Sequence, residues 1–590
     1  MRRILAPALA IALCASSRAA APVAWQPWSD AAFAQARREH KFVIMDLEAV
    51  WCHWCHVMDE TTYRDPNVGA LLASRYVAVK VDQDSRPDLS NRYEDYGWPA
   101  TVVFAADGSE IVRRRGYIDP AQMARMLQAI IDDPSPGPSV TSPSGGSAPS
   151  GASAAAPGAL RQRVIAGYDR SLGGWSLEHR FLDADNVEYC LRAASRGDAE
   201  ASAIARDMLR LETRLLDPAW GGVYQYSAEG DWDHPHFEKI MSMQADNIRA
   251  YSAAADLWPD WGYEKPAASI VGYLGRFLTA PDGSFYTSQD ADLVAGEQGG
   301  GYFSLGDKER RARGIPRVDT HRYARENGWA IRALCAYYAA AGDDAALSKA
   351  QAAARWALAG RALPGGGFRH GDRDGAGPYL GDTLAMGQAF LALYGSTGDG
   401  EWLAHAESAA DFIAGHFGRG GLPGFATSAP VAGAGPGPRP QFDEQVALAR
   451  FANLLGHASG RAADHAIAAS ALRWASAPDV AGRRHAYVGG LLLAVEELGS
   501  EPLHVTVVGP RGDARALALH RCALRAPSTY KLVEWWDKAA GPAPRGDAIF
   551  PDIRKPSAYL CANGACSAPV TDPSALSRRL AKAISVAGQE

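Results

Sequence analysis

Two patterns of apolar and polar positions divide this chain near residue 134. Before that point, short apolar runs alternate with helical segments, as in KFVIMDLEAVW (41–51), CHVMDETTY (55–63), YVAVKVDQD (76–84) and GWPATVVFAADG (97–108). The first and third of these predict buried strands, the second the start of a helix, and the fourth a strand and a turn. We therefore expect a mixed α/β domain over residues 24–133.

Beyond residue 158 the pattern becomes a repeat of Ala-rich apolar helices. Gly-aromatic turns separate them: GGW at 173, GGVYQYS at 221, GSFYTS at 283, GGGFRH at 365 and GGLPGF at 420. Residues 159–499 hold about six helical hairpins of roughly 57 residues each, which predicts a closed α/α toroid, since an open stack would leave apolar edges that need capping. The open end of such a toroid forms a funnel whose aromatic residues suit sugar rings.

Residues 134–158, PSPGPSVTSPSGGSAPSGASAAAPG, join the two regions. Their composition predicts a flexible linker with an r.m.s. span of roughly 25 to 30 Å, so we expect the domains to be separable. After residue 499 the apolar pattern changes and predicts a strand, a helix, two strands and a final helix. We therefore expect a small α/β region over residues 500–590. The expected fold class is thus multidomain, α/β plus all-α.

The first 19 residues are typical of an export signal. A basic start, Arg2 and Arg3, precedes an apolar segment and the small-residue stretch Ser17-Arg18-Ala19. We expect a periplasmic or secreted protein with no stable membrane insertion after cleavage, because the apolar segment is shorter than the roughly 20 residues that span a bilayer. The net charge of -6 and the short basic runs give no footprint for nucleic acid.

Candidate chemistry centres on WCHWCHVMDE, residues 51–60, which fits three motifs. Cys52 and Cys55 form Cys-x-x-Cys, a redox dithiol; with His56 they form the attachment motif of a c-type haem; and with His53 they offer four metal ligands. A strand leading into Cys-x-x-Cys at the start of a helix favours the dithiol, because a helix N-terminus stabilises thiolate. Cys52 would then be the nucleophile and Cys55 the resolving thiol.

The neighbours of the dithiol fit the same chemistry. A protonated His53 would stabilise the Cys52 thiolate, with Trp54 beside it, and Trp98-Pro99 occupies the place of a cis-proline in a thioredoxin-like fold. A purely structural Cys52–Cys55 disulfide remains an alternative. We expect no cofactor and no structural metal, although His53 and His56 leave adventitious zinc or copper binding open.

Four motifs in order, WCHWCHVM, KVD, RPD and GWP, resemble the thioredoxin-like domain of the YyaL and spermatogenesis-associated thioredoxin-domain family. They begin at Trp51, Lys80, Arg86 and Gly97. The resemblance continues at PHFEK (235–239), at the acidic loop QDADLVAGEQGGGYF (289–303) and at AYLC and PVTD near the C-terminus. It implies a thioredoxin-like domain joined to a helical domain, and it covers most of the chain without fixing a reaction.

Several polar residues are candidates for the funnel of the toroid, where paired carboxylates could act as acid and base on a glycosidic bond. They are His234, His236 and Glu238, then Asp290, Asp292 and Glu297, with Asp382, Asp443 and Glu444 at the starts of predicted inner helices. Each group has an alternative role. Asp382 and Asp443 could cap helices, Asp290, Asp292 and Glu297 could order their loop or bind calcium, and His236 and Glu238 could make structural hydrogen bonds.

Among the eight cysteines, Cys561 and Cys566 form a second close pair, expected to be a local disulfide, with an electron relay to Cys52 as the alternative. Cys190, Cys335 and Cys522 are expected to be buried thiols. Two functions remain open. One is an exported thiol-disulfide oxidoreductase with a protein partner and a glycan-binding toroid; the other is a carbohydrate hydrolase or epimerase in the toroid with an accessory thioredoxin-like domain.

Overall fold

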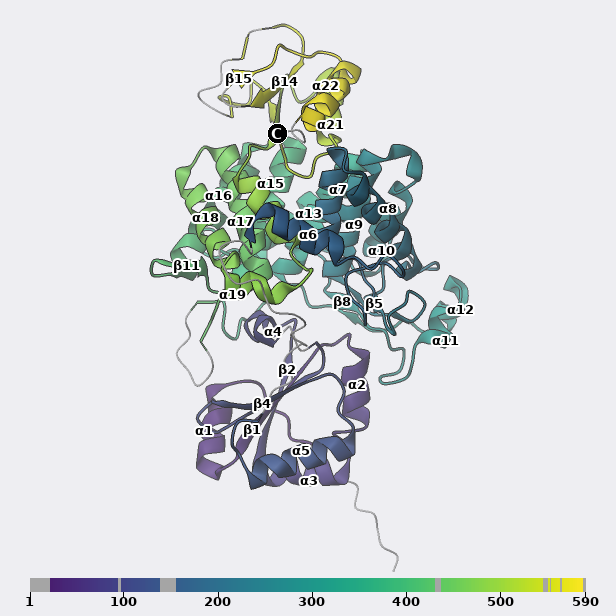
Figure 1. Ribbon diagram of the computed structural model, residues 1–590, viewed down its shortest axis with the longest axis vertical. Coiled ribbons are helices and arrows are strands. Elements are labelled where there is room, and N and C mark those ends of the chain that lie inside the picture. The colour runs from purple at the N-terminus through teal and green to yellow at the C-terminus, as the bar shows by residue number, and fades with distance from the viewer. Residues whose placement is uncertain are drawn as a thin grey trace, which may run out of the picture.

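The computed structural model describes residues 22–93, 97–137, 155–429, 437–544, 550–551, 553–562 and 565–586. The predicted signal segment and most of the predicted linker lie outside these residues. Three parts follow one another along the long axis of the molecule: an α/β domain at one end, a ring of helices in the middle and a small α/β region at the other end (Figure 1). The predicted fold class is confirmed.

The N-terminal domain is a four-stranded sheet with helices on both faces. Its strand order is β2-β1-β3-β4, with β1 and β2 parallel and the other pairs antiparallel. The strands are β1 Phe42–Glu48, β2 Tyr76–Asp82, β3 Ala100–Phe104 and β4 Glu110–Arg115, and the helices are α1 Asp30–Glu39, α2 His53–Glu60, α3 Pro66–Arg75, α4 Pro87–Tyr93 and α5 Pro120–Asp132. Apolar side chains from both faces of the sheet form two cores, one under α1 and one under α3 and α5. This is a thioredoxin-like arrangement.

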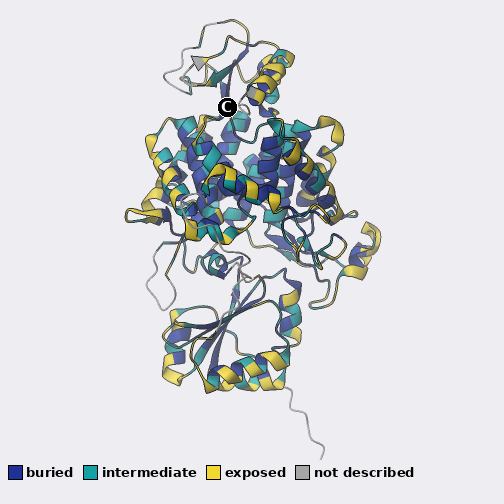
Figure 2. Ribbon diagram, in the orientation of Figure 1, coloured by how far each residue is buried: buried dark blue, intermediate teal, exposed yellow. Residues whose placement is uncertain are grey.

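Six inner helices form the ring. Each contacts the next in the order α7, α9, α13, α15, α17 and α20, and α20 contacts α7 again, so the ring is closed. Their bounds are α7 Ala184–Ser195, α9 Met241–Leu257, α13 Ala324–Ala341, α15 Leu380–Thr397, α17 Phe442–Ser459 and α20 Gly489–Leu498. Figure 2 shows buried residues concentrated along these helices, as expected where a helix packs on both sides.

Outer helices cover the ring. They are α6 Pro157–Ala166, α8 Ala199–Glu212, α10 Glu264–Phe277, α14 Asp344–Gly360, α16 Gly400–Phe417 and α18 Ala462–Ala475. Each of the last five packs on the inner helix before it in the chain, whereas α6 packs on α20, so the first and last helices form the sixth pair. Pro157 and Gly158 were predicted to lie in the linker; that prediction was wrong at its C-terminal edge, because Pro157 occupies the first turn of α6, where proline is well tolerated.

The turns at one end of the ring carry short strands and helices that face the N-terminal domain. A three-stranded sheet, β7-β8-β9, brings distant loops together there. The elements are β5 Tyr226–Ser227, β6 Pro235–His236, β7 Lys239–Ile240, β8 Ser288–Gln289, α11 Gly300–Phe303, α12 Asp307–Arg313, β9 Val318–Asp319, β10 Gly418–Arg419, β11 Leu422–Phe425 and α19 Pro478–Ala481. We call this end of the ring, formed by the loops 217–240, 284–323, 365–382 and 425–444, the mouth.

The C-terminal region covers the opposite end of the ring (Figure 1). Its sheet has the order β13-β12-β14-β15 and packs against α21 and α22. The elements are β12 Leu503–Val508, α21 Ala514–Leu524, β13 Lys531–Trp536, β14 Ser557–Ala562, β15 Ala565–Cys566 and α22 Pro573–Val586. A disulfide joins Cys561 to Cys566 across the β14–β15 pair. Because the ring lies between this pair and the N-terminal domain, the two cysteine pairs are too far apart for direct exchange.

Candidate functional site

The dithiol sits where strand β1 passes into helix α2. Cys52 is the N-cap of α2, its Sγ accepts a hydrogen bond from the Cys55 amide at 3.1 Å, and the two sulfur atoms are joined in a disulfide. The Trp98-Pro99 peptide bond is cis, and Trp98 packs against the apolar cluster that contains both cysteines. The helix N-terminus therefore directs its backbone dipole at Cys52, which favours a thiolate there on reduction.

The mouth of the ring covers this dithiol. Cys52 is 4% exposed and Cys55 2%, and Ile240 of the mouth packs on their cluster. Trp54, between the cysteines, is 38% exposed and lies against Tyr117, with ring centroids 5.7 Å apart. In this structure the reactive end of one domain is an interface with the other, and the expected separability of the two domains stays a prediction.

Two histidines of the Cys-x-x-Cys helix share one carboxylate of the mouth. His53 Nδ1 lies 2.7 Å from Asp292 Oδ1, and His56 Nδ1 lies 3.0 Å from Asp292 Oδ2. The hydrogen bond to Asp292 raises the pKa of His53. Burial by itself would lower the pKa of His56, but the bond to the same carboxylate and the nearby acidic groups outweigh burial, so the pKa of His56 is raised as well. Burial alone would raise the pKa of Asp292, yet the bonds from both imidazoles hold it at about 2. A charged carboxylate therefore bridges two imidazoles beside the dithiol and favours their protonated form.

Glu238 contributes a second carboxylate from the mouth. Its Oε1 accepts a hydrogen bond from the backbone N–H of His53 at 3.3 Å. Its Oε2 lies 3.8 Å from His236 Nδ1 and has no hydrogen-bond partner among the described residues, although Glu238 is only 3% exposed. His236 in turn stacks on Tyr226, with ring centroids 4.3 Å apart. Glu238 thus reaches the residue next to Cys52 from a part of the chain 185 positions away.

A further chain of bonds links the tryptophan before Cys52 to the ring. Trp51 Nε1 donates to Asp84 Oδ2 at 2.7 Å, and the Asp84 carbonyl oxygen accepts from His370 Nε2 at 2.6 Å. His370 Nδ1 lies 2.9 Å from Asp382 Oδ1. Burial opposes charge on His370, but Asp382 outweighs it and raises the pKa of His370. Asp382 is therefore a partner of a buried histidine rather than a helix cap.

Asn91 on α4 joins the N-terminal domain to Glu444, another of the candidates from the sequence. Its Nδ2 donates to Thr427 Oγ1 at 2.8 Å and to Glu444 Oε1 at 2.9 Å. Burial raises the pKa of Glu444 to about 7. Asp84 comes two residues after KVD, and Asn91 comes three residues after RPD. These motifs therefore adjoin the surface of the N-terminal domain that contacts the mouth.

Three predicted candidates lie away from this interface. His234 bonds to Asp231 at 2.9 Å in an exposed turn, and Glu297 is exposed in the loop after Asp292. Asp443 pairs with Arg484 at 2.9 Å, half-exposed, in the first turn of α17. The structure gives these three only local contacts.

Two groups of side chains have metal-ligand spacing. The ligand atoms of His56, Asp290 and Asp292 lie within 4.8 Å of one another, and so do those of Asp46, Glu48 and Asp59. In the second group the Lys80 ammonium lies 2.6 Å from Asp59 and 2.7 Å from Glu48, so a cation already fills it. In the first, burial raises the pKa of Asp290 to about 6, whereas the pKa of Asp292 is held at about 2, so Asp292 alone stays charged in moderate acid.

Sequence reasoning missed Asp84, Asn91, Ile240 and His370 as parts of this interface. His370 ends the GGGFRH turn and Ile240 follows PHFEK, so both stand in motifs that had been noticed for their glycines or charges. Asp84 and Asn91 flank RPD. The available signal was that all four adjoin family motifs, which suggests a shared surface.

The fold and the dithiol together define a class: a thioredoxin-like redox domain followed by an α/α toroid. Residues 14–131 match the family Thioredox_DsbH, described as a protein of unknown function, DUF255. The chain is 26% identical to human spermatogenesis-associated protein 20 over 315 residues, 46% of this chain and 39% of that protein. The resemblance predicted from the motifs is confirmed, and the chain spans about two fifths of the length of these relatives.

Other comparisons concern the two parts separately. Over 105 residues, 17% of this chain and 18% of the relative, the chain is 38% identical to thiol:disulfide interchange protein DsbD 1 of Pseudomonas aeruginosa. Among solved structures, D-mannose isomerase aligns with a TM-score of 0.45 and 13% identity, covering 60% of this chain and 99% of that one. Cellobiose 2-epimerase from Bacillus thermoamylovorans aligns with a TM-score of 0.42 and 10% identity, covering 54% and 86%. No helix among the described residues combines the length and apolar character needed to cross a bilayer.

Proposed function

We propose that this protein is an exported thiol-disulfide oxidoreductase whose dithiol, Cys52 and Cys55, works at the mouth of the toroid. The observation that carries the proposal is the disulfide at the N-terminus of α2, beside a cis-proline and against ionisable residues of the mouth. The match to a thiol:disulfide interchange protein over the N-terminal domain supports it. The direction of transfer follows from the potential of the couple relative to its partner.

In the reducing direction the chemistry is a two-step exchange. The Cys52 thiolate attacks one sulfur of the substrate disulfide, so a mixed disulfide forms and the other substrate sulfur leaves as a thiolate that takes up a proton. The Cys55 thiolate then attacks Cys52 Sγ, which releases the second substrate thiol and leaves the Cys52–Cys55 bond. Two electrons pass from the dithiol to the substrate. Oxidation of a substrate runs the same steps in reverse.

The mouth residues have distinct roles in this proposal. Charged His53 stabilises thiolate on the adjacent Cys52, and Asp292 keeps that imidazole protonated and oriented. Glu238 Oε2, buried and without a hydrogen bond, accepts the proton released when the Cys55 thiol ionises. Because the mouth covers both sulfur atoms, a protein partner reacts when the domains part, which the linker of residues 134–158 permits.

The partner is therefore a protein thiol or disulfide outside the cytoplasm, and the mouth selects it, in this proposal by binding a glycan it carries. A direct test of the redox function is the intact mass of the alkylated protein after equilibration in a series of glutathione buffers. Cys52 and Cys55 should interconvert as one two-electron couple. The Cys52→Ser variant should lose that couple, while the Cys561/Cys566 double Ser variant should keep it. A Cys52–Cys55 pair that stays bridged in every buffer would refute the proposal.

A carbohydrate-active toroid is the second candidate, favoured by one observation. Three buried carboxylates of the mouth, Glu238, Asp319 and Asp382, and Glu326 in the first turn of α13 each carry an oxygen without a hydrogen bond to any described residue. Sugar hydroxyls would satisfy such oxygens. The test is the hydrolysis or epimerisation of a panel of mono- and disaccharides. Glu238→Gln should lower turnover by about 100-fold or more, the usual loss on removal of a general acid or base. The glutathione couple of Cys52 should persist in this variant. Wild-type protein inactive on the whole panel would contradict this second function.

A further inference from the structure

A cavity lies inside the ring, at the end away from the dithiol. It has a volume of about 190 Å³, and residues of α7, α9 and α13 line it together with residues 526–531 of the C-terminal region. Since a water molecule needs roughly 10–15 Å³ measured in this way, the space admits about a dozen waters or a ligand of similar size. Nothing in the proposed redox chemistry uses it.

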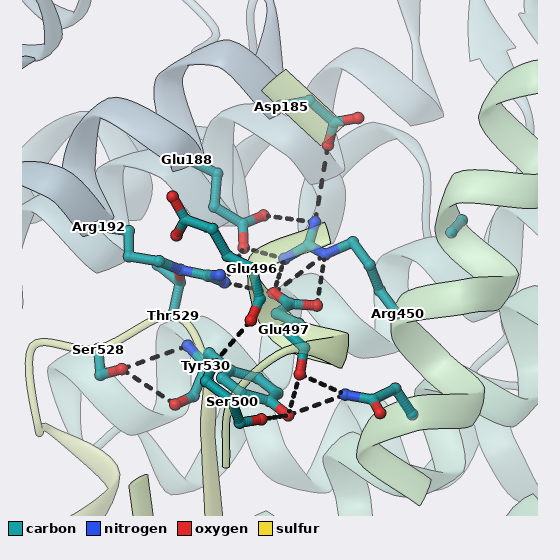
Figure 3. Close-up of polar contacts among 12 residues, drawn as sticks. Asp185, Glu188, Arg192, Arg450, Glu496, Glu497, Ser500, Ser528, Thr529 and Tyr530 are labelled. Atoms are coloured by element: carbon teal, nitrogen blue, oxygen red, sulfur yellow. Dashed lines mark hydrogen bonds and ion pairs between the residues drawn. The ribbon is translucent and has the colours of Figure 1, made fainter. Parts of the chain in front are cut away.

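A network of ion pairs forms the wall of the cavity beside α7 and continues away from it to α17 and α20 (Figure 3). Glu188 of α7 accepts from Arg249 of α9 at 2.9 Å and from Arg450 of α17, and Arg450 also pairs with Glu497 of α20 at 3.0 Å. Arg192 pairs with Glu497 and donates to Thr529 Oγ1 at 3.0 Å. The arginines of this network thus have carboxylate partners.

Arg332 of α13 does not share in it. Its side chain is half-buried and lines the cavity, yet no hydrogen bond or ion pair joins it to any residue that the structure describes. Burial, together with repulsion from Arg249 and Arg450, lowers the pKa of Arg332 to about 9, against the opposing attraction of Glu188 and Asp246, neither of which bonds to it directly. A guanidinium that lines a cavity without a hydrogen-bonded partner can bind an anion there, and a bound anion would stabilise its charge.

Two further groups of the cavity wall point the same way. Ser252 is 2% exposed and its Oγ has no hydrogen-bond partner among the described residues, although it lines the cavity. Lys531 donates only to backbone carbonyls of Leu524 and Ala526. The wall therefore offers a hydroxyl and two cations that no side chain of the described chain neutralises by direct contact.

We propose that this cavity binds a small aliphatic carboxylate, held by a two-point contact between the carboxylate and the Arg332 guanidinium. The class follows from the wall. Glu188, Asp246 and Asp256 also line the cavity and disfavour a dianion such as phosphate, while none of its lining residues is aromatic, as a sugar ring would favour. Ala250, Ala336 and Leu257 supply apolar surface for a short alkyl chain.

Calorimetric titration of the full-length protein with acetate, butyrate and hexanoate tests the site, with butyramide as the uncharged match and sodium phosphate at equal ionic strength. Binding of at least one carboxylate is expected, and none of butyramide or phosphate. Arg332→Gln should weaken that binding roughly 30-fold or more, the usual effect of removing one partner of a buried charge pair. Arg355→Gln, an exposed arginine of outer helix α14, should leave it unchanged.

Stability of the unliganded variants separates a ligand site from a structural arginine. If Arg332 awaits an anion, Arg332→Gln should melt at or above the wild-type temperature, because an unpaired buried charge is removed. Three results would each overturn the proposal. They are a lower melting temperature for Arg332→Gln, no binding of any of the three carboxylates at about 10 mM, a concentration suited to weak ligands, and binding of phosphate equal to that of the carboxylates.

Discussion

At the scale of single residues, the site is made by side chains that lie far apart in the sequence. The local part could be predicted: Cys52, Cys55 and Pro99 follow from a strand, a helix start and the spacing of a thioredoxin-like fold, all within 50 residues. Periodicity could not predict that Asp292 and Glu238 contact His53. These contacts span 239 and 185 positions and depend on how the two domains pack. Asp292 and Glu238 were candidates for acid and base chemistry on a sugar, with loop ordering or calcium binding and a structural hydrogen bond as alternatives, and the same carboxylates bond to the dithiol helix.

The shared carboxylate of Asp292 should make the stability of the interface depend on pH. The pKa values of His53 and His56 are raised above their ordinary 6.5, so their contribution is complete below pH 6.5 and is lost as pH rises through the raised values. The pKa of Asp292 is lowered from 3.8 to about 2, so its contribution is lost only in strong acid. The difference in melting temperature between wild type and Asp292→Asn should therefore be largest between pH 4 and 6.5 and shrink toward pH 9.

Asp282→Asn is the matched control for this measurement. Asp282 pairs with Arg322, which stays charged between pH 5 and 9, and the pKa of Asp282 is lowered, so the effect of its removal should not vary over that range. An Asp292→Asn effect that is constant over the same range would contradict the bridging of two imidazolium groups.

At the scale of elements, the sequence predicted the strands and helices whose apolar pattern is strong. The three strands β1, β2 and β3 are buried along their length, and each had been predicted. Strand β4, EIVRRR, was not, since only Ile111 and Val112 are buried and three arginines follow. It lies at the edge of the sheet, where charged residues protect against pairing with other chains and at the same time weaken the sequence signal.

Close packing of the inner helices gives a prediction about one glycine. A Cβ added to Gly328 of α13 would lie 2.6 Å from the backbone carbon of Ala385 in α15, so Gly328→Ala should separate two adjacent helices of the ring. We expect a loss of stability of about 1–3 kcal/mol by chemical denaturation. Gly272→Ala in outer helix α10 has only a contact at 3.7 Å and should be neutral or slightly stabilising. Equal effects of the two substitutions would contradict the tight α13–α15 contact.

At the scale of the whole molecule, the repeat predicted the number and type of helical units, and their closure is observed as the contact of α20 with α7. The position of the N-terminal domain over the mouth was not predicted, because a linker of 25 residues constrains its distance but not its orientation. Only the complementary surfaces fix that orientation. The KVD and RPD motifs lie on one of them and the PHFEK and QDAD motifs on the other.

If the mouth shields the dithiol, then loosening the interface at a distance from the sulfur atoms should expose it. Asn91→Ala removes two interdomain hydrogen bonds, to Thr427 and Glu444, without touching the Cys52–Cys55 cluster. Reduction of Cys52–Cys55 by a water-soluble phosphine should become several-fold faster, on the order expected for a loss of about 1 kcal/mol from neutral hydrogen bonds. Timed alkylation and peptide mass would measure it.

The second disulfide provides an internal control for the Asn91 experiment. Cys561–Cys566 lies beyond the far end of the ring and should be reduced at the same rate in both proteins. An unchanged rate at Cys52–Cys55, or equal acceleration of both pairs, would argue against a shield formed by the mouth.

The pairing of α6 with α20 has a consequence for synthesis of the chain. The first outer helix, α6, lacks the inner helix on which it packs until Gly489–Leu498 has left the ribosome, more than 300 residues later. At 5–20 residues per second, that wait lasts roughly 17 to 65 s. During it the N-terminal domain, whose own core is already complete, is present without a mouth to cover it. A nascent chain therefore passes through a period in which its dithiol is open to any oxidant or carrier, and ring closure ends that period.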